Sequence, residues 1–212
     1  LFSYGFIALN VAIFLMQVNM PSAQLQAFIY DYGSIPAETM RGQDLFTLLT
    51  SMFLHGGWMH LIGNMLFLWV FADNIEATIG NGRFFLFYIL GGLAAHAAHI
   101  YFNAGSTVPT VGASGAISAV MGAYLVMFPA SRIKMLFFVF TFRVPAFIFL
   151  GFWIWQQWIS GTAALQVDTA QSEGVAWWAH IGGFAFGVLA GFYYRMKFTR
   201  PRRDYYGDQN YL

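Results

Sequence analysis

Residues 84–103 read FFLFYILGGLAAHAAHIYFN, twenty positions without one charged side chain. The hydrocarbon core of a bilayer is about 30 Å thick, and a helix needs about 20 apolar residues to cross it. The stretch therefore predicts a transmembrane helix. The composition extends this prediction to the rest of the chain, which is 58% hydrophobic and only 9% charged, whereas soluble domains are about 25% charged.

Five further apolar runs flank this stretch, so the sequence predicts an all-α, polytopic membrane protein with six spans in a single domain, 1–212. The predicted spans are 1–19 (apolar from Phe2), 58–79, 84–103, 114–129, 144–161 and 175–196. Proline and glycine interrupt residues 20–57, which are therefore expected to form an outer loop. The apolar segment 131–143 is short and flanked by charge, so we expect it at the membrane interface. Residues 197–212 are expected to be a cytoplasmic tail.

The basic residues predict the orientation of these spans. Nine of the ten fall on one side of a six-span chain, and only Arg41 falls on the other. Because positive charge accumulates in cytoplasmic loops, both termini are predicted to be cytoplasmic. We expect a multi-pass protein of a prokaryotic cytoplasmic membrane. The nine residues are Arg83, Arg132, Lys134, Arg143, Arg195, Lys197, Arg200, Arg202 and Arg203.

Polar side chains inside spans usually face the protein interior or a water-filled cavity. Those that stand out in the predicted spans are His60, Asn64, His96, His99, Ser114, Ser118 and His180. Ser114 and His180 each lie fifteen residues from the cytoplasmic end of their span, which is about 22 Å along a helix. Both are then about 8 Å below the outer surface, and Asn64 has a similar depth.

The fourth span is short for a full crossing, so we expect its helix to begin inside the membrane. The preceding residues, 104–113, must then dip into the protein. Irregular backbone is tolerated at this depth only where it is buried in protein or lines water. The sequence therefore predicts a hydrated cavity above Ser114 that opens to the outer side.

These residue types suit nucleophilic catalysis. A serine hydroxyl becomes a useful nucleophile when a histidine takes its proton. Ser114 stands at a helix start, where backbone N–H groups lack intrahelical acceptors and can help to hold an oxyanion. His60 and Asn64 are spaced i, i+4 and share a helix face, so both can donate to that oxyanion. No carboxylate is predicted at this depth, which favours a dyad over a triad, although spacing leaves open which histidine is the base.

Each feature also has a structural explanation. Gly112-Ala-Ser114-Gly115 is a weak motif in a chain with 22 glycines, and small residues in membrane helices often serve close packing. We interpret Gly183 and Gly187 as a packing face that presses the sixth span against the start of the fourth. His96 and His99 are one turn apart and could bind a metal, as in a histidine-based metal transporter. Without a ligating carboxylate nearby, we predict interior hydrogen bonds and no metal site.

Three motifs together resemble the rhomboid intramembrane serine proteases, and the resemblance covers nearly the whole chain. They are His55-Gly-Gly-Trp-Met-His60-Leu-Ile-Gly-Asn64, Gly112-Ala-Ser114-Gly-Ala116, and Ala179-His180-Ile-Gly-Gly183 followed by Gly187. The resemblance implies Ser114 as nucleophile and His180 as general base. It also implies an oxyanion hole formed by His60, Asn64 and the Ser114 backbone, with Gly112, Gly115, Gly183 and Gly187 in helix packing.

The resemblance further implies hydrolysis of peptide bonds in or near the membrane segments of single-span proteins, which would enter laterally past the fifth span and residues 162–174. Lipid and these substrates are the expected partners, and neither a cofactor nor nucleic acid is expected. The alternative is a catalytically silent, client-binding relative. Two departures from the family pattern are Phe46-Thr47, where Trp-Arg is common, and Ser118, where an aromatic ring often packs on the histidine. We also expect no seventh span within residues 198–212.

Overall fold

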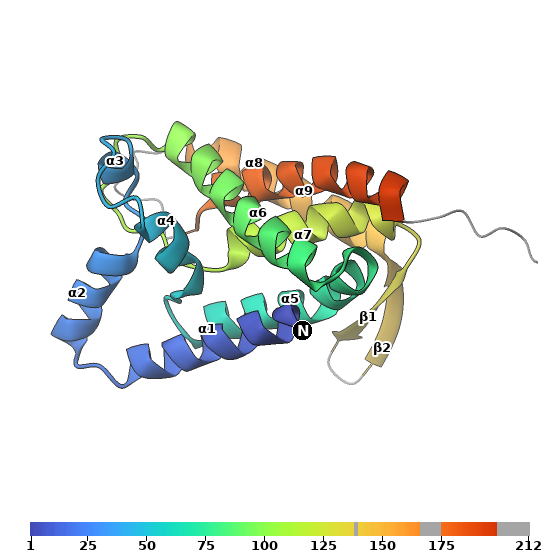
Figure 1. Ribbon diagram of the computed structural model, residues 1–212, viewed down its shortest axis with the longest axis horizontal. Helices are drawn as coiled ribbons and strands as arrows, with labels where there is room; N and C mark the ends of the chain where they lie inside the picture. Colours follow the sequence, from blue (N-terminus) through green and yellow to red (C-terminus); the bar gives the residue numbers. More distant parts are fainter. Residues whose placement is uncertain (138–139, 166–174, 199–212) are drawn as a thin grey trace, which may run out of the picture.

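The computed structural model describes residues 1–137, 140–165 and 175–198, and over these the protein is a helical bundle with one small β-hairpin (Figure 1). The predicted tail from residue 199 and residues 166–174 of the predicted entry loop lie outside the described ranges. The helices are α1 (Phe2–Val18), α2 (Ser22–Tyr32), α3 (Pro36–Thr39), α4 (Thr47–Thr50), the 3₁₀ helix η1 (Ser51–Phe53), α5 (Trp58–Ile79), α6 (Asn81–Phe102), α7 (Ser114–Met127), α8 (Ala146–Ala164) and α9 (Trp177–Phe198).

Helix α7 is the centre of the bundle. All of its 14 residues except Ser114 and Leu125 are buried, as expected of a helix that is apolar all round. It packs most extensively against α9, then against α6 and α5. At 1.5 Å per residue it is about 21 Å long, shorter than the hydrocarbon core of a bilayer. A helix of this length does not cross that core by itself.

A helix occupies each of the six ranges predicted to be spans, but the segments between them differ from expectation. Residues 20–57 contain three helices and a 3₁₀ turn where the sequence suggested a loop. The position of segment 131–143 at the membrane interface stays a prediction, but the secondary structure there is defined. The segment belongs to an antiparallel hairpin of β1 (Arg132–Phe137) and β2 (Phe140–Pro145), with Lys134 opposite Arg143. The phenylalanine and valine residues of the hairpin suit a β-strand. The second strand ends at Pro145, so α8 begins two residues later than predicted.

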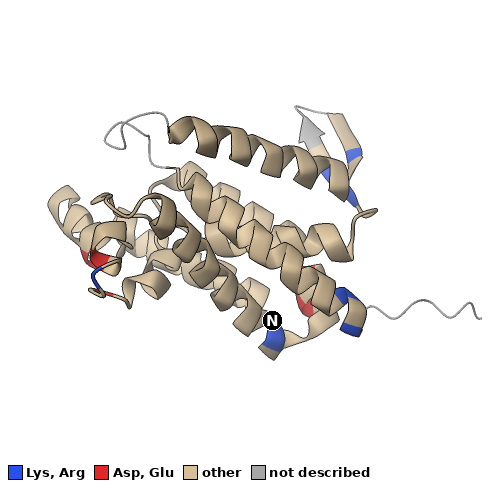
Figure 2. Cartoon of the chain, turned by 90° about the horizontal axis from the view of Figure 1, so that it is seen from above, with Lys and Arg blue, Asp and Glu red and all other residues tan. Residues whose placement is uncertain are grey.

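Among the described residues, those with a charge gather at two opposite ends of the molecule and leave an uncharged middle (Figure 2). Large apolar side chains are exposed along that middle, for example Leu66, Leu90, Phe152 and Leu189. Among the described helices, α6 is the one that meets both the length and the apolar composition of a membrane span. α1 and α7 are apolar but shorter, at 17 and 14 residues. The exposed apolar band is the surface expected of a protein whose surrounding solvent is lipid.

The segment between α6 and α7 is irregular, and its backbone bonds to the segments that precede α5. Ser34 and Thr110 exchange two backbone hydrogen bonds, and the Ala37 N–H donates to the Ser106 carbonyl. The Gly112 N–H donates to the Ser51 carbonyl at 2.9 Å. These bonds satisfy polar backbone that would otherwise be stranded within the bundle, and they hold the chain where it enters α7.

Helix α1 is fastened at both ends. At its start, the buried Glu76 carboxylate accepts hydrogen bonds from the Phe2 and Ser3 N–H groups at 2.6 and 2.9 Å. At its other end, the buried Gln17 amide bonds both the N–H and the carbonyl of His55. The second contact fixes the backbone that leads into α5.

Candidate active site

Ser114 is the first residue of α7 and is half-buried. Gly112, two residues earlier, has φ +127°, a conformation that residues with a Cβ rarely adopt. The chain enters α7 directly after this turn. The first hydrogen bond of the helix is from the Ile117 N–H to the Ala113 carbonyl. The N–H groups of Ser114, Gly115 and Ala116 consequently have no acceptor within the helix.

His180 lies in the first turn of α9, and its Nε2 is 2.8 Å from the Ser114 Oγ. The two helices approach closely because glycines line their contact. A Cβ on Gly183 would collide with the Gly115 carbonyl, and one on Gly187 would collide with the Ala119 carbonyl. Gly115 itself makes room for α6, since a Cβ there would be 2.5 Å from the Ala95 Cβ. Backbone-to-backbone contact thus sets the distance between the serine and the histidine.

His60 and Asn64 lie on α5 beside the turn that precedes Ser114. A Cβ on Gly112 would be 2.8 Å from the His60 Nε2 and 3.6 Å from the Asn64 Nδ2. The Gly56 N–H approaches the His60 Nδ1 at 3.4 Å. A proton on His60 is then left to Nε2, the nitrogen that faces Gly112. Two side-chain N–H donors therefore lie beside Gly112, in the turn that leads to Ser114 and to the free N–H groups at the start of α7.

His55 has a part in this site that the sequence did not predict. Its Nε2 is 3.0 Å from the Asn64 Nδ2, and its ring centroid is 5.1 Å from that of His60. Burial, with a smaller contribution from the neighbouring His60, lowers the pKa of His55 to about 4. A neutral His55 can accept the Asn64 N–H and so orient the amide. Its place at the start of the motif that runs from His55 to Asn64 was the available signal.

Gln157 is the second residue that sequence reasoning missed. It is 3% exposed on α8, and its Oε1 is 2.7 Å from the His180 Nδ1. Ser118 does not reach His180, because its hydroxyl donates to the Ser114 carbonyl at 2.6 Å. The rings near His180 are instead those of Trp153 and Trp177, with centroids at 5.8 and 6.3 Å. The two adjacent glutamines, Gln156 and Gln157, in the apolar run 144–161 were the signal that could have identified it.

The other family departure, Phe46-Thr47, lies away from these residues. The Phe46 ring is half exposed and contacts Tyr32 edge-on. Thr47 is buried and donates its hydroxyl to the Asp44 carbonyl. The pair therefore contributes to packing within the segment between α1 and α5.

His96 and His99 point to different partners. The His96 Nε2 is 3.1 Å from the Ser51 Oγ, and the His99 Nε2 is 3.0 Å from the Thr110 Oγ1. Within the described ranges, no three histidine or acidic side chains cluster as metal ligands. Each histidine instead joins α6 to a segment that leads toward α5 or α7.

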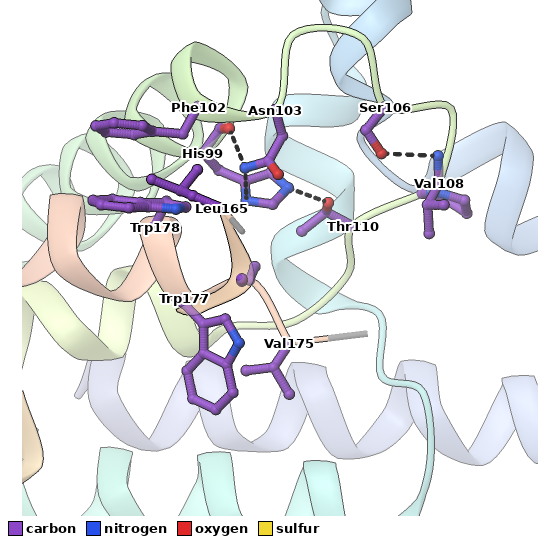
Figure 3. Close-up of a pocket in the computed structure, with 13 residues that line it drawn as sticks. His99, Phe102, Asn103, Ser106, Val108, Thr110, Leu165, Val175, Trp177 and Trp178 are labelled. Atoms are coloured by element: carbon purple, nitrogen blue, oxygen red, sulfur yellow. Dashed lines mark hydrogen bonds between the residues drawn. The ribbon is translucent and has the colours of Figure 1, made fainter. Parts of the chain in front are cut away.

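A hollow of about 270 Å³ opens beside the site, with His99, Asn103 and Thr110 on one wall and Trp177 and Trp178 on another (Figure 3). Thr110 and Ala176 also line the narrow cleft that contains Ser114. The hollow and the cleft therefore adjoin.

Comparison with known proteins identifies a family and several relatives. The family model described as Rhomboid domain matches residues 42–197. The chain is 30% identical over 210 residues to Rhomboid protease GluP of Bacillus subtilis, covering 98% of this chain and 37% of that protein. It is 26% identical over 204 residues to Rhomboid protein 1, mitochondrial, of Saccharomyces cerevisiae, covering 94% and 55%. The human Presenilin-associated rhomboid-like protein, mitochondrial, is 28% identical over 193 residues, covering 87% and 46%. The chain thus spans about a third to a half of the length of these relatives.

Proposed function

The chain belongs to the rhomboid family, and we propose that it is an intramembrane serine endopeptidase that uses Ser114 and His180. It is an integral membrane protein of that family. The observation that carries the proposal is the 2.8 Å separation of the Ser114 Oγ and the His180 Nε2. In a chain without cysteine, this pair matches the nucleophile and base needed for acyl transfer.

In the proposed mechanism, His180 takes the hydroxyl proton as Ser114 attacks a peptide carbonyl carbon. The tetrahedral intermediate places its negative charge beside the N–H groups of Ser114, His60 and Asn64. His180 then protonates the leaving amine, which departs and leaves an acyl-enzyme. Water, activated by the same histidine, attacks the ester, and collapse of the second intermediate releases the acid and restores Ser114.

The donors around Ser114 supply most of the expected rate enhancement. They are held by secondary structure and by the His55 contact, so they need little rearrangement when charge develops. Loss of one oxyanion donor in a serine protease typically costs about 10²- to 10³-fold in kcat. The absence of an acidic partner among the described contacts of His180 makes these donors more important than they are in a triad.

The proposal includes the membrane arrangement. Six helices, α1 and α5 to α9, would cross the bilayer within one domain, and the basic ends of α6 and α9 would face the cytoplasm. The site would then open to the outer side, in a prokaryotic cytoplasmic membrane. Substrates would be single-span membrane proteins that enter laterally past α8, so that a helix-loosening segment reaches Ser114 in extended form.

Reaction with a fluorophosphonate probe tests the proposed activity directly. We expect wild-type protein in detergent to be labelled on Ser114 and to cleave a single-span substrate in liposomes. Ser114→Ala should lose both properties while its thermal unfolding stays within a few degrees of wild type. Cleavage retained by Ser114→Ala would refute the proposal, and client binding without labelling would favour a silent, client-binding protein.

A further inference from the structure

Gln157 is a polar residue buried in an otherwise apolar helix. The buried residues of α8 are Ala146, Leu150, Gln157 and Gly161, which form one narrow stripe along the helix. Burial of an amide without hydrogen bonds costs about 1–3 kcal/mol in proteins. A leucine would fill the same space in this stripe. The presence of an amide there therefore indicates a specific hydrogen-bond partner.

The partners of Gln157 define which way its amide points. The Nε2 donates to the Gln156 Oε1 at 2.9 Å, and the Oε1 faces the His180 Nδ1 at 2.7 Å. A carbonyl oxygen can only accept, so the proton of this second bond belongs to Nδ1 of the imidazole. In a neutral ring the other nitrogen, Nε2, then carries the lone pair, and this is the nitrogen that faces the Ser114 Oγ.

We propose that Gln157 is the positioning residue of the site: its carbonyl oxygen holds His180 in the tautomer that can act as a base toward Ser114. The inference rests on the proposed function, because it assigns the means by which the base of that same reaction is oriented. In soluble triads an aspartate fills this place, and its replacement by asparagine, which stabilises the wrong tautomer, lowers kcat by about 10⁴-fold. Here a neutral amide orients the imidazole and fixes its tautomer, as the aspartate does in a triad.

Because Gln157 lies on α8, its hydrogen bond to His180 depends on the packing of α8 against α9. Near its C-terminal end α8 rests on α9 through Gly161, where a Cβ would be 3.3 Å from Ile181 and 3.4 Å from Trp177. Gln157 lies one turn away and faces His180 from the same stripe. A displacement of α8 by even 1 Å would lengthen the 2.7 Å contact beyond a strong hydrogen bond. The proposed dyad is therefore complete only while α8 is docked against α9.

The variants that test this inference are Gln157→Leu, which removes the acceptor, and Gln157→Glu, which keeps one. The matched control is Thr162→Val on the same helix, because the Thr162 hydroxyl donates to the Trp158 and Ile159 carbonyls of α8 and has no other partner among the residues that the structure describes. We expect Gln157→Leu to lower kcat, and the rate of fluorophosphonate labelling, by about 10²-fold with KM nearly unchanged. Gln157→Glu should recover most of the loss, and Thr162→Val should equal wild type.

A second measurement does not depend on activity. The ¹⁵N spectrum of histidine-labelled protein, assigned with a His180→Gln variant, should show His180 protonated at Nδ1 in wild type and at Nε2, or at both, in Gln157→Leu. An unchanged tautomer in Gln157→Leu would overturn the inference, as would a kcat equal to that of wild type. If wild type neither cleaves nor reacts with the probe, the proposed function fails while the tautomer measurement still decides the role of Gln157.

Discussion

Replacing Gly183 with alanine adds one methyl group at the closest approach of α9 to α7. The new Cβ would lie 3.1 Å from the Gly115 carbonyl carbon and would overlap its oxygen. Both are backbone atoms at the start of a helix that is buried on nearly every side, so they cannot turn away as a flexible side chain would. The helix α9 must move instead.

The size of that movement follows from ordinary contact distances. Non-bonded heavy atoms settle about 3.5 Å apart, so α9 has to retreat from α7 by roughly 1 Å. The 2.8 Å contact between the Ser114 Oγ and the His180 Nε2 would then approach 4 Å, beyond hydrogen-bond range. A misplacement of about 1 Å can cost about 10²-fold in rate, and overpacking costs about 1–3 kcal/mol of stability.

The assay is the rate of fluorophosphonate labelling, measured together with thermal unfolding in detergent. Gly183→Ala should be labelled at least about 10²-fold more slowly yet unfold cooperatively. Gly5→Ala is the matched control, because a Cβ at Gly5 meets nothing within 4 Å, and it should match wild type in labelling. If Gly183→Ala is folded and labelled at the wild-type rate, backbone contact between α7 and α9 does not set the serine–histidine distance, and the reasoning fails.

Three further predictions concern the surroundings of the site. Asn64→Ala should lower kcat by about 10²-fold with little change in KM, and equal kcat in the variant and wild type would exclude Asn64 as an oxyanion donor. Because the pKa of His55 is lowered from 6.5 to about 4, the folded state resists its protonation. Stability should therefore fall by up to about 3 kcal/mol as the pH drops from 6.5 to 4, and the fall should be shallower in His55→Gln, as measured by thermal unfolding at each pH. Glu76→Ala should destabilise the protein by about 1–3 kcal/mol, because the Phe2 and Ser3 N–H groups lose their acceptor, and an unchanged unfolding temperature would contradict this.

The helical bundle was predictable because lipid demands long apolar runs with satisfied backbone. Depth along a helix also follows from counting residues, which put Ser114 and His180 in one layer. Rotation about the helix axis does not follow from counting. That rotation depends on which glycines meet, and the contact of Gly183 with the Gly115 carbonyl becomes visible only in three dimensions. The roles of Ser114, His180, His60 and Asn64 remain predictions for the experiments above.

The features that the sequence did not predict share one physical cause. Gln17 and Gln157 bond to partners that are 38 and 23 residues away along the chain. No local sequence pattern identifies which residue the partner is. Both are polar residues in apolar helices, so their presence was itself a signal of a buried partner. The β-hairpin after α7 was missed for a different reason: a short apolar run flanked by charge has no period that separates strand from surface helix.

A neutral orienting group suits the depth of this site. A carboxylate buried within the bundle at the level of His180 would carry a large desolvation cost unless its charge were compensated, whereas the Gln157 amide is neutral and makes two hydrogen bonds. The same choice has a chemical consequence, because an amide carbonyl stabilises an imidazolium ion less than a carboxylate does. Proton transfer to His180 should therefore be harder than in a triad, and more of the barrier must be lowered at the oxyanion.

A double variant tests this. The factor by which Asn64→Ala lowers kcat is measured in wild type and in Gln157→Glu, where negative charge is restored beside His180. A larger factor in wild type would show that the oxyanion donors and the group beside His180 both lower the barrier, as argued. Equal factors in the two backgrounds would show that orientation alone, without charge, is what Gln157 contributes.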